Sequence, residues 1–270
     1  PQIRHRVFIV GIRNDVAKKI GMNWMNISRI YPEPNETDKP VINDAIRDLQ
    51  TDPVNEAESV ELCESMKKSA KYKNIIRFFI GDVRDKERLM LAMDSEVDYV
   101  IHAGAITRPM VIHEDNPKLS IKTNIIGTSN VVLMCERYNK KIIYISTDYV
   151  YEGTDGDYKE TDAMKPFTKY GWSKLGGECA VQMYDNHLIL RMAMNRKPFP
   201  HPKALIDMRK SLMYTEDAAK VTLKLLDEKG IINVGGKSQS VYDFVKENDT
   251  GKLLRMIYSI AKMNIEHVQI

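Results

Sequence analysis

The residues best placed to do chemistry are Tyr170 and Lys174, four positions apart in the segment YGWSK. On a helix, positions i and i+4 share one face, so the Lys174 ammonium could approach the Tyr170 hydroxyl. Lowering a phenol pKa from ~10 to near neutrality takes about 4 kcal/mol. One ammonium at about 4 Å supplies a comparable amount at an effective dielectric near 20. The motif alone is weak, because most Tyr–Lys pairs with this spacing are plain surface pairs.

A third candidate, Thr147, follows the apolar run KIIYIS, which we predict to be a buried strand over 141–146. The helix that carries Tyr170 is expected over 169–184, one crossover later. At the end of its strand, Thr147 could hydrogen-bond the substrate oxygen that Tyr170 protonates, and proton transfer of this kind is a common catalytic device. Thr147, Tyr170 and Lys174 therefore form the predicted catalytic set.

Short β-rich runs alternate with longer helical patterns from Arg77 onward. We predict further strands over 77–80, 98–103 and 187–191, and helices over 86–93 and 117–138. The helix over 117–138 should present one largely apolar face, which includes Ile121. This alternation is typical of a parallel sheet with crossover helices. The predicted fold class is α/β, with a Rossmann-type doubly wound parallel sheet.

The composition favours an ordinary globular protein that needs neither disulfides nor metals. The 270 residues include 40 basic and 37 acidic ones, mixed along the chain, so the charge gives no support to nucleic-acid or membrane binding. Three cysteines, Cys63, Cys135 and Cys179, lie far apart, with no His or Cys cluster at metal-ligand spacing, so no metal is expected. We expect reduced cysteines in a cytoplasmic protein. No apolar run approaches the ~18 residues of a membrane span, and the opening apolar stretch is short for a signal peptide.

Several ordered motifs strengthen the Tyr170 and Lys174 prediction. The segments ISTDYVYEG (145–153), YKETD (158–162) and YGWSKLGGE (170–178) resemble the dTDP-4-dehydrorhamnose reductase branch of the extended short-chain dehydrogenases. The segments RFFIGDVRD, YVIHAGA and KTNIIGTSNVV are similar to the wider family of nucleotide-sugar epimerases and dehydratases, particularly UDP-sugar 4,6-dehydratases. The resemblance runs roughly from Arg77 to Lys246.

The resemblance implies a site for NADP or NAD. Asp82 and Val83 would contact the adenine, and Asn124 would support the active-site helix and its water. Lys174 would also reach the nicotinamide ribose. A turn of small residues would let the cofactor backbone pass over the sheet. Those residues are Ala103, Gly104 and Ala105. Taken alone, Ala103, Gly104 and Ala105 would also fit a tight strand end, and Asn124 would also fit a surface amide.

The phosphate loop departs from the family pattern. Such chains open with G-x-x-G-x-x-G after the first strand, whose backbone N–H groups meet the pyrophosphate. The matching residues here are Gly11, Asn14 and Ala17, and Asn14 can adopt a left-handed conformation at modest cost. Arg13 could contact phosphate. Arg29 could favour the 2′-phosphate of NADP, and an ordinary surface arginine is the alternative.

We predict a cofactor-binding Rossmann domain over 1–191, with a loop or insertion over 31–53. A small substrate-binding lobe is expected over 192–270, interleaved with the last strands and helices of the sheet. Its segment 251–264 is expected to be a plain amphipathic helix.

The leading functional hypothesis is reduction of a nucleotide-linked 4-keto sugar with NAD(P)H, with Tyr170 giving the proton. A nucleotide-sugar 4-epimerase or 4,6-dehydratase is the alternative enzyme, although a dehydratase needs an acid/base pair and the sequence offers only Asp148 beside Thr147. A non-catalytic, cofactor-sensing or regulatory subunit is the alternative outside enzymes. The expected partners are the sugar nucleotide and a second copy, packed through helices 117–138 and 169–184.

Overall fold

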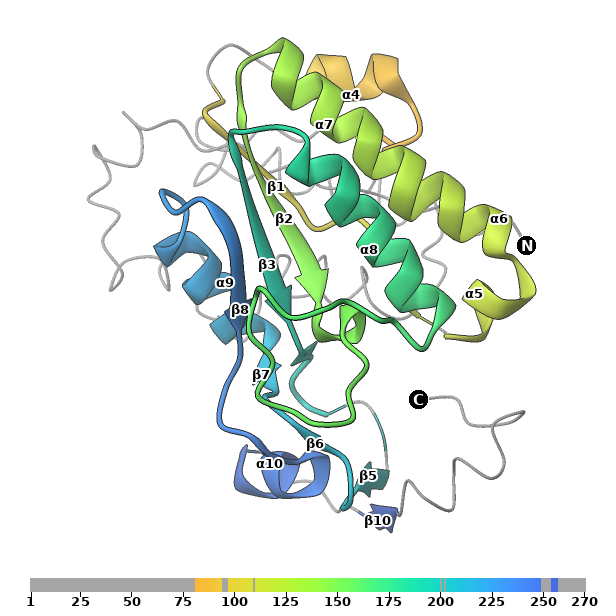
Figure 1. Cartoon of the computed structure of the whole chain (residues 1–270), viewed down its shortest axis with the longest axis vertical. Coiled ribbons are helices and arrows are strands. Elements are labelled where there is room, and N and C mark those ends of the chain that lie inside the picture. The colour runs from red at the N-terminus through yellow and green to blue at the C-terminus, as the bar shows by residue number, and fades with distance from the viewer. Residues whose placement is uncertain are drawn as a thin grey trace, which may run out of the picture.

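The computed structural model describes residues 81–93, 97–108, 110–199, 201 and 203–248, together with the strand at 254–256. The glycine loop, the segment 31–53 and the strand expected over 77–80 lie outside these residues. Four parallel strands of the described part form one sheet, as Figure 1 shows. Their order across the sheet is β1 (Tyr99–His102), β2 (Lys141–Thr147), β3 (His187–Met192) and β8 (Gly230–Val234). The strands expected over 98–103, 141–146 and 187–191 are thereby confirmed.

Three of the helices expected from the sequence are also present. The helix expected over 86–93 is α4 (Lys86–Ala92), and the one expected over 169–184 is α8 (Lys169–Gln182). The long helix expected over 117–138 runs through three contiguous pieces, α6 (Pro117–Ser120), η2 (Ile121–Gly127) and α7 (Thr128–Arg137). A further helix, α9 (Thr215–Lys224), precedes β8.

Each face of the sheet has its own apolar cluster, because successive side chains of a strand point to opposite faces. On β2, Ile142 and Tyr144 belong to the cluster that α4, α7 and α8 complete. Ile143 belongs to the opposite cluster, to which α9 contributes Ala218. Figure 1 shows α4, α7 and α8 together on one side of the strands and α9 on the other. Helices on both faces of a parallel sheet define the Rossmann-type layering that the sequence predicts.

One turn of the long helix is a π-helix, the element η2. The wider turn changes which residues point toward the sheet. Thr128 and Cys135 are buried as the apolar spacing predicts, whereas Ile121 is 47% exposed, so the prediction was wrong for this residue. Asn124, in the middle of the π turn, is fully buried.

Apart from α9 and β8, the described residues after β3 form a small lobe with its own buried cluster, which includes Leu205, Tyr214 and Phe244. It contains α10 (Val241–Asn248) and three pairs of short strands. The pairs are β4 (Met194–Asn195) with β7 (Met213–Tyr214), β5 (Lys203–Leu205) with β10 (Leu254–Met256), and β6 (Arg209–Lys210) with β9 (Gln239–Ser240). The prediction of a helix over 251–264 is wrong at β10, because backbone pairing with β5 holds those residues extended.

Two further findings bear on the sequence predictions. Cys135 and Cys179 are free thiols, the first buried and the second exposed. Among the residues that the structure describes, no helix combines the length and the apolar character that crossing a bilayer requires.

Candidate active site

Thr147 is the last residue of β2 and lies at the carboxyl edge of the sheet, the edge where parallel α/β sheets bind ligands. The next residues form the short helix η3 (Asp148–Val150). The Thr147 hydroxyl donates to Asp148 Oδ1 at 3.2 Å and accepts from the Tyr149 amide at 3.3 Å. These contacts fix the hydroxyl at the strand end.

Tyr170 lies in the first turn of α8, and its phenol is close enough to Thr147 for that residue to lower the phenol pKa. Two local features bring the helix start to this place. The Thr168 hydroxyl caps α8 by accepting from the Gly171 amide at 3.0 Å. Gly171 lets the helix approach the Tyr149 carbonyl so closely that a Cβ there would clash. The fold therefore brings Tyr170 to the strand end that carries Thr147.

Aromatic and charged groups surround the Tyr170 phenol. Its ring packs against that of His113 in α5 (Val111–Asp115), with 5.2 Å between the ring centroids. It also packs edge-on against Tyr149, with 5.9 Å between the ring centroids. Burial raises the pKa of Tyr170 above its ordinary value, and the charges of Asp148 and Tyr149 raise it further. Thr147 and the Arg108 guanidinium act in the opposite direction. The phenol is therefore protonated at neutral pH, ready to donate.

Lys174 does not take the place that the i, i+4 spacing predicts. Its ammonium donates to the Ile145 carbonyl at 2.8 Å and lies 4.0 Å from the centroid of the Tyr144 ring. The backbone carbonyl and the aromatic face thus hold the ammonium. Burial lowers the pKa of Lys174 to about 7, and the charge of Glu178 opposes this. The cation that favours the Tyr170 phenolate is Arg108 instead.

The residues expected at the cofactor lie at the same carboxyl edge. Ala103, Gly104 and Ala105 follow β1 directly, and Ala103 is exposed. The Asn124 amide holds this turn: its Oδ1 accepts from the Ile106 amide at 2.7 Å, and its Nδ2 donates to the Ile106 carbonyl at 2.9 Å. Nδ2 also donates to Ser173 Oγ on α8 at 2.8 Å. Asn124 thus ties the turn after β1 to the helix that carries Tyr170.

Asp82 and Val83 precede α4. The Asp82 carboxylate accepts from the Arg84 amide at 2.9 Å and from Arg84 Nε at 2.8 Å. The Val83 side chain is fully buried against Gly127, which leaves only its backbone for an adenine ring. The remaining predicted cofactor residues, Gly11, Arg13, Asn14, Ala17 and Arg29, lie outside the described residues.

The sequence reasoning missed three side chains near Tyr170: Arg108, His113 and Lys210. The Arg108 guanidinium donates to Asn195 Oδ1 at 2.8 Å, across 87 residues of sequence. Lys210 comes from the C-terminal lobe, and its ammonium lies 2.7 Å from Asp148 Oδ2. No local motif marks these residues, because only the tertiary fold brings them to the strand ends.

A parallel sheet with threonine at the end of a central strand, and tyrosine and lysine one turn apart on the next helix, defines the class of extended short-chain dehydrogenases. The chain belongs to a particular family within this class. The model of the RmlD substrate binding domain family matches residues 58–195, just over half of the 270 residues.

Two relatives illustrate the range of similar proteins. Over 106 residues the chain is 44% identical to a UDP-N-acetylglucosamine 4,6-dehydratase (inverting) of Campylobacter jejuni, a match that covers 39% of this chain and 27% of that protein. Over 103 residues it is 33% identical to the methionine adenosyltransferase 2 subunit beta of Xenopus laevis. That match covers 38% of this chain and 30% of the relative. The chain thus matches less than a third of the length of either relative.

Among solved structures, the chain is similar to the dTDP-4-dehydrorhamnose reductase of Bacillus anthracis, solved in complex with NADP. The TM-score is 0.57 and the identity 23%, and the match covers 66% of this chain and 72% of that one. At this identity the likeness supports the Rossmann-type fold.

Proposed function

We propose that the chain reduces a nucleotide-linked 4-keto sugar with NAD(P)H. The observation that carries this proposal is that Thr147 and Tyr170 lie beside each other at the carboxyl edge of the sheet, with Lys174 one turn further along α8. These residues have the types and the order that the class uses for proton transfer at a carbonyl.

The chain's own residues supply the proton and the orientation. NAD(P)H held at the strand ends would supply a hydride to the C4 carbonyl carbon. As the carbonyl π bond breaks, the oxygen takes the proton of the Tyr170 hydroxyl, while Thr147 holds that oxygen by a hydrogen bond. Tyr170 then regains a proton from solvent. The raised pKa of Tyr170 suits this direction, because the phenol is protonated when the reaction begins.

The residues at the strand ends fit a nicotinamide cofactor. Ala103 and Ala105 have no side chain beyond Cβ, and Ala103 is exposed, so the turn after β1 leaves its backbone open. The Lys174 ammonium carries donors beyond the one that the Ile145 carbonyl accepts, and these could reach a ribose hydroxyl. We assign the pyrophosphate to the loop of Gly11, Arg13, Asn14 and Ala17, and a 2′-phosphate to Arg29.

Positive charge at the start of the C-terminal lobe supports a diphosphate-bearing substrate. Burial lowers the pKa of Arg108, and the nearby Arg196 charge lowers it further. Burial, Arg108 and Arg196 likewise lower the pKa of His201. The like charges of Arg108 and Arg196 would gain from a bound anion. We therefore assign the cofactor to residues 1–191 and the sugar nucleotide largely to the lobe over 192–270.

The pairing of Asp148 favours a reductase over a 4,6-dehydratase. An elimination needs an acid beside Thr147, but the Asp148 carboxylate is in an ion pair with Lys210 at 2.7 Å. Lys210 and the Thr147 hydroxyl thus hold both oxygens of this carboxylate. The match to a Campylobacter dehydratase keeps that reaction as the second candidate. Retention of bound cofactor after purification would favour it or an epimerase, because those reactions regenerate the cofactor in each cycle.

A regulatory role is the candidate outside enzymes, and the match to a methionine adenosyltransferase subunit motivates it. A non-catalytic protein has no chemical need for Thr147 beside Tyr170 with Lys174 one turn further along the helix. The intact set therefore supports the enzyme.

We also propose a homodimer through the long helix and α8, in a reducing cytoplasmic compartment. Apolar side chains on these helices are half or more exposed: Leu133 at 51%, Trp172 at 55% and Met183 at 88%. Burying them would stabilise a paired state. The free thiols of Cys135 and Cys179 fit a reducing setting. Sedimentation of the wild type and of Trp172→Glu would test the pairing, since the charge should shift a dimer to monomer.

The test of the proposed function is a fluorescence titration with NADPH and with NADH, repeated on Arg29→Ala. We expect micromolar binding, weakened for NADPH but not for NADH in the variant if Arg29 holds the 2′-phosphate. Absence of binding at millimolar concentrations of both cofactors would overturn the reductase proposal and favour a regulatory subunit.

A further inference from the structure

Lys210 reaches from the C-terminal lobe to the strand end that carries Thr147. It lies on β6, whose backbone pairs with β9. Its ammonium is 2.7 Å from Asp148 Oδ2 and 3.8 Å from the centroid of the Tyr149 ring. The Lys210 side chain is 16% exposed, so solvent screens the pair only in part.

The partner of Lys210 is joined to the proposed proton-transfer site. One oxygen of Asp148 pairs with Lys210, and the other accepts from the Thr147 hydroxyl at 3.2 Å. Tyr149, which follows Asp148, packs edge-on against the Tyr170 ring with 5.9 Å between the ring centroids. The groups that Lys210 contacts therefore lie directly beside Thr147 and the phenol.

The charge of Asp148 matters for Tyr170 because an unpaired carboxylate nearby disfavours a phenolate. The charged and titratable groups that face Tyr170 are Asp148 and Tyr149 from η3 and Arg108 from the turn after β1, with the His113 ring of α5 packed against it. Lys210 contacts both members from η3. Its ammonium is thus placed to offset the groups that work against ionisation of Tyr170.

We propose that Lys210 is a positioning residue for proton transfer: it neutralises Asp148 beside Tyr170 and holds the carboxylate so that Thr147 stays directed at the phenol. This role deepens the proposed reductase function and rests on it. The C-terminal lobe then does more than bind substrate, since it contributes the cation that tunes the acid on the sheet.

The test reads the ionisation of residue 170 without cofactor or substrate. With 3,5-difluorotyrosine incorporated at position 170, whose phenol ionises at lower pH than that of tyrosine, the ¹⁹F signal is followed against pH. Lys210→Met should raise the midpoint by about one pH unit, because Asp148 is left unpaired. Asp148→Asn should lower it by a similar amount, because the ammonium is left unpaired. The double variant should return close to the parent, and Lys210→Arg should retain the parent midpoint.

The matched control is Lys220→Met, which removes an exposed lysine–carboxylate pair of 2.9 Å on α9. It should leave the midpoint unchanged. Equal midpoints for Lys210→Met and Lys220→Met, or shifts of the same sign for Lys210→Met and Asp148→Asn, would overturn the proposal. A merely structural role of Lys210 would loosen the site in both variants alike. Failure of cofactor binding would overturn the reductase function. The titration would still report whether Lys210 and Asp148 control the ionisation of residue 170, because it uses no cofactor.

Discussion

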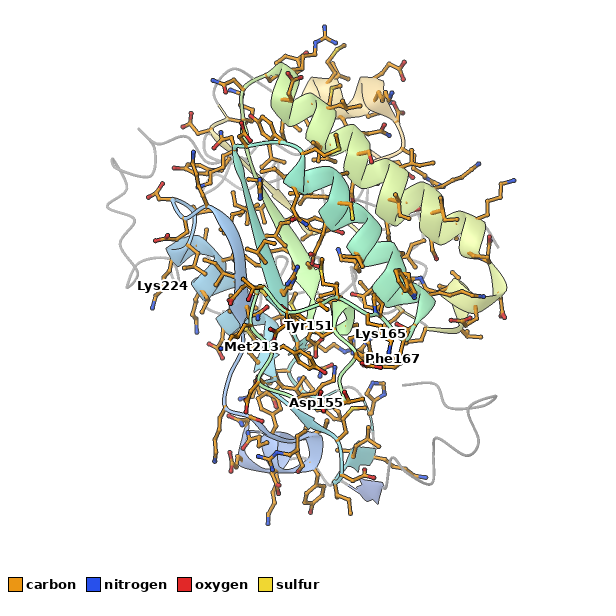
Figure 2. All side chains as sticks on the ribbon, in the orientation of Figure 1. Tyr151, Asp155, Lys165, Phe167, Met213 and Lys224 are labelled. Carbon is orange, nitrogen blue, oxygen red and sulfur yellow. The ribbon has the colours of Figure 1, made fainter. Side chains whose placement is uncertain are left out.

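Glu178 of α8 and Arg191 of β3 form an ion pair at 2.8 Å in which the two side chains are 0% and 1% exposed. Arg191 also donates to the Tyr151 hydroxyl at 2.6 Å, and Ser146 donates to Glu178. The Tyr151 hydroxyl donates to Asn233 Oδ1 at the end of β8. This network joins the helix that carries Tyr170 to the sheet and to the segment between η3 and α8. Figure 2 shows Tyr151, Lys165 and Phe167 of that segment near the lower ends of the strands.

Breaking this pair should destabilise the fold. Glu178→Gln leaves the Arg191 charge buried without its partner, and such changes cost about 3–5 kcal/mol. Urea unfolding measures the loss. Lys165→Met, which removes the exposed pair with Glu152, should change the free energy of unfolding by at most about 1 kcal/mol. Equal effects of the two variants would show that burial of the Glu178–Arg191 pair does not control stability.

Asn124→Leu should weaken the site as well as the fold. The variant loses the hydrogen bonds to the Ile106 backbone and to Ser173, and it leaves a buried amide N–H unpaired. Each unsatisfied buried group costs about 1–3 kcal/mol. Asn130→Leu is the control, since Asn130 donates from the same long helix to a single backbone carbonyl, that of Val83. If Asn124→Leu lost no more stability than the control in a thermal melt, the tie between the turn after β1 and α8 would be unimportant.

His102 should make the protein sensitive to acid. Burial, and then the Lys174 charge, lower the pKa of this histidine to about 3. The unfolded chain therefore takes up a proton near pH 6.5, whereas the folded chain does not until the pH is far lower. Stability contributed by neutral His102 is present above pH ~6.5 and is lost as the pH falls toward 3, by about 2 kcal/mol at pH 5.

The measurement compares urea unfolding at pH 7 and pH 5. His102→Gln removes the titrating group but keeps an N–H that can donate to Thr128, as the imidazole does at 2.9 Å. We expect the variant to lose less stability than the wild type over this interval. An equal loss in both proteins would assign the acid sensitivity to other groups.

Local pattern was enough to predict β1, β2 and β3 of the sheet and the helix that carries Tyr170. The strand ending at Thr147 and the helix starting at Lys169 follow from apolar runs and from the i, i+4 spacing, which are properties of neighbouring residues. The direction in which a side chain points could not be predicted from these local patterns. Lys174 turns to the Ile145 carbonyl and the Tyr144 ring, groups that a distant strand brings to the helix.

Contacts across the chain could not be predicted for the same reason. Lys210 meets Asp148 over 62 residues, and neither residue carries a local signal for the other. The π turn at 121–127 likewise has no marker in the apolar spacing, which is why Ile121 was expected to be buried. The family motifs predicted Thr147, Tyr170 and Lys174 as site residues. The nearby charges of Arg108 and Lys210 became visible only in the fold.

The central claim is that Tyr170 gives the proton in reduction of a 4-keto sugar nucleotide. Its most direct test is a single-turnover measurement of NADPH oxidation by the full chain with a nucleotide-linked 4-keto-6-deoxy sugar, in the wild type and in Tyr170→Phe. The control is Tyr99→Phe, which removes a hydroxyl bonded to Asp227 at 2.7 Å, at the far end of β1 from the site.

We predict substrate-dependent oxidation in the wild type and in Tyr99→Phe, and a rate lower by about 10²–10⁴-fold in Tyr170→Phe with NADPH binding unchanged. Equal rates in Tyr170→Phe and the wild type would contradict the account, as would cofactor binding by the wild type without any oxidation across the 4-keto sugar nucleotides.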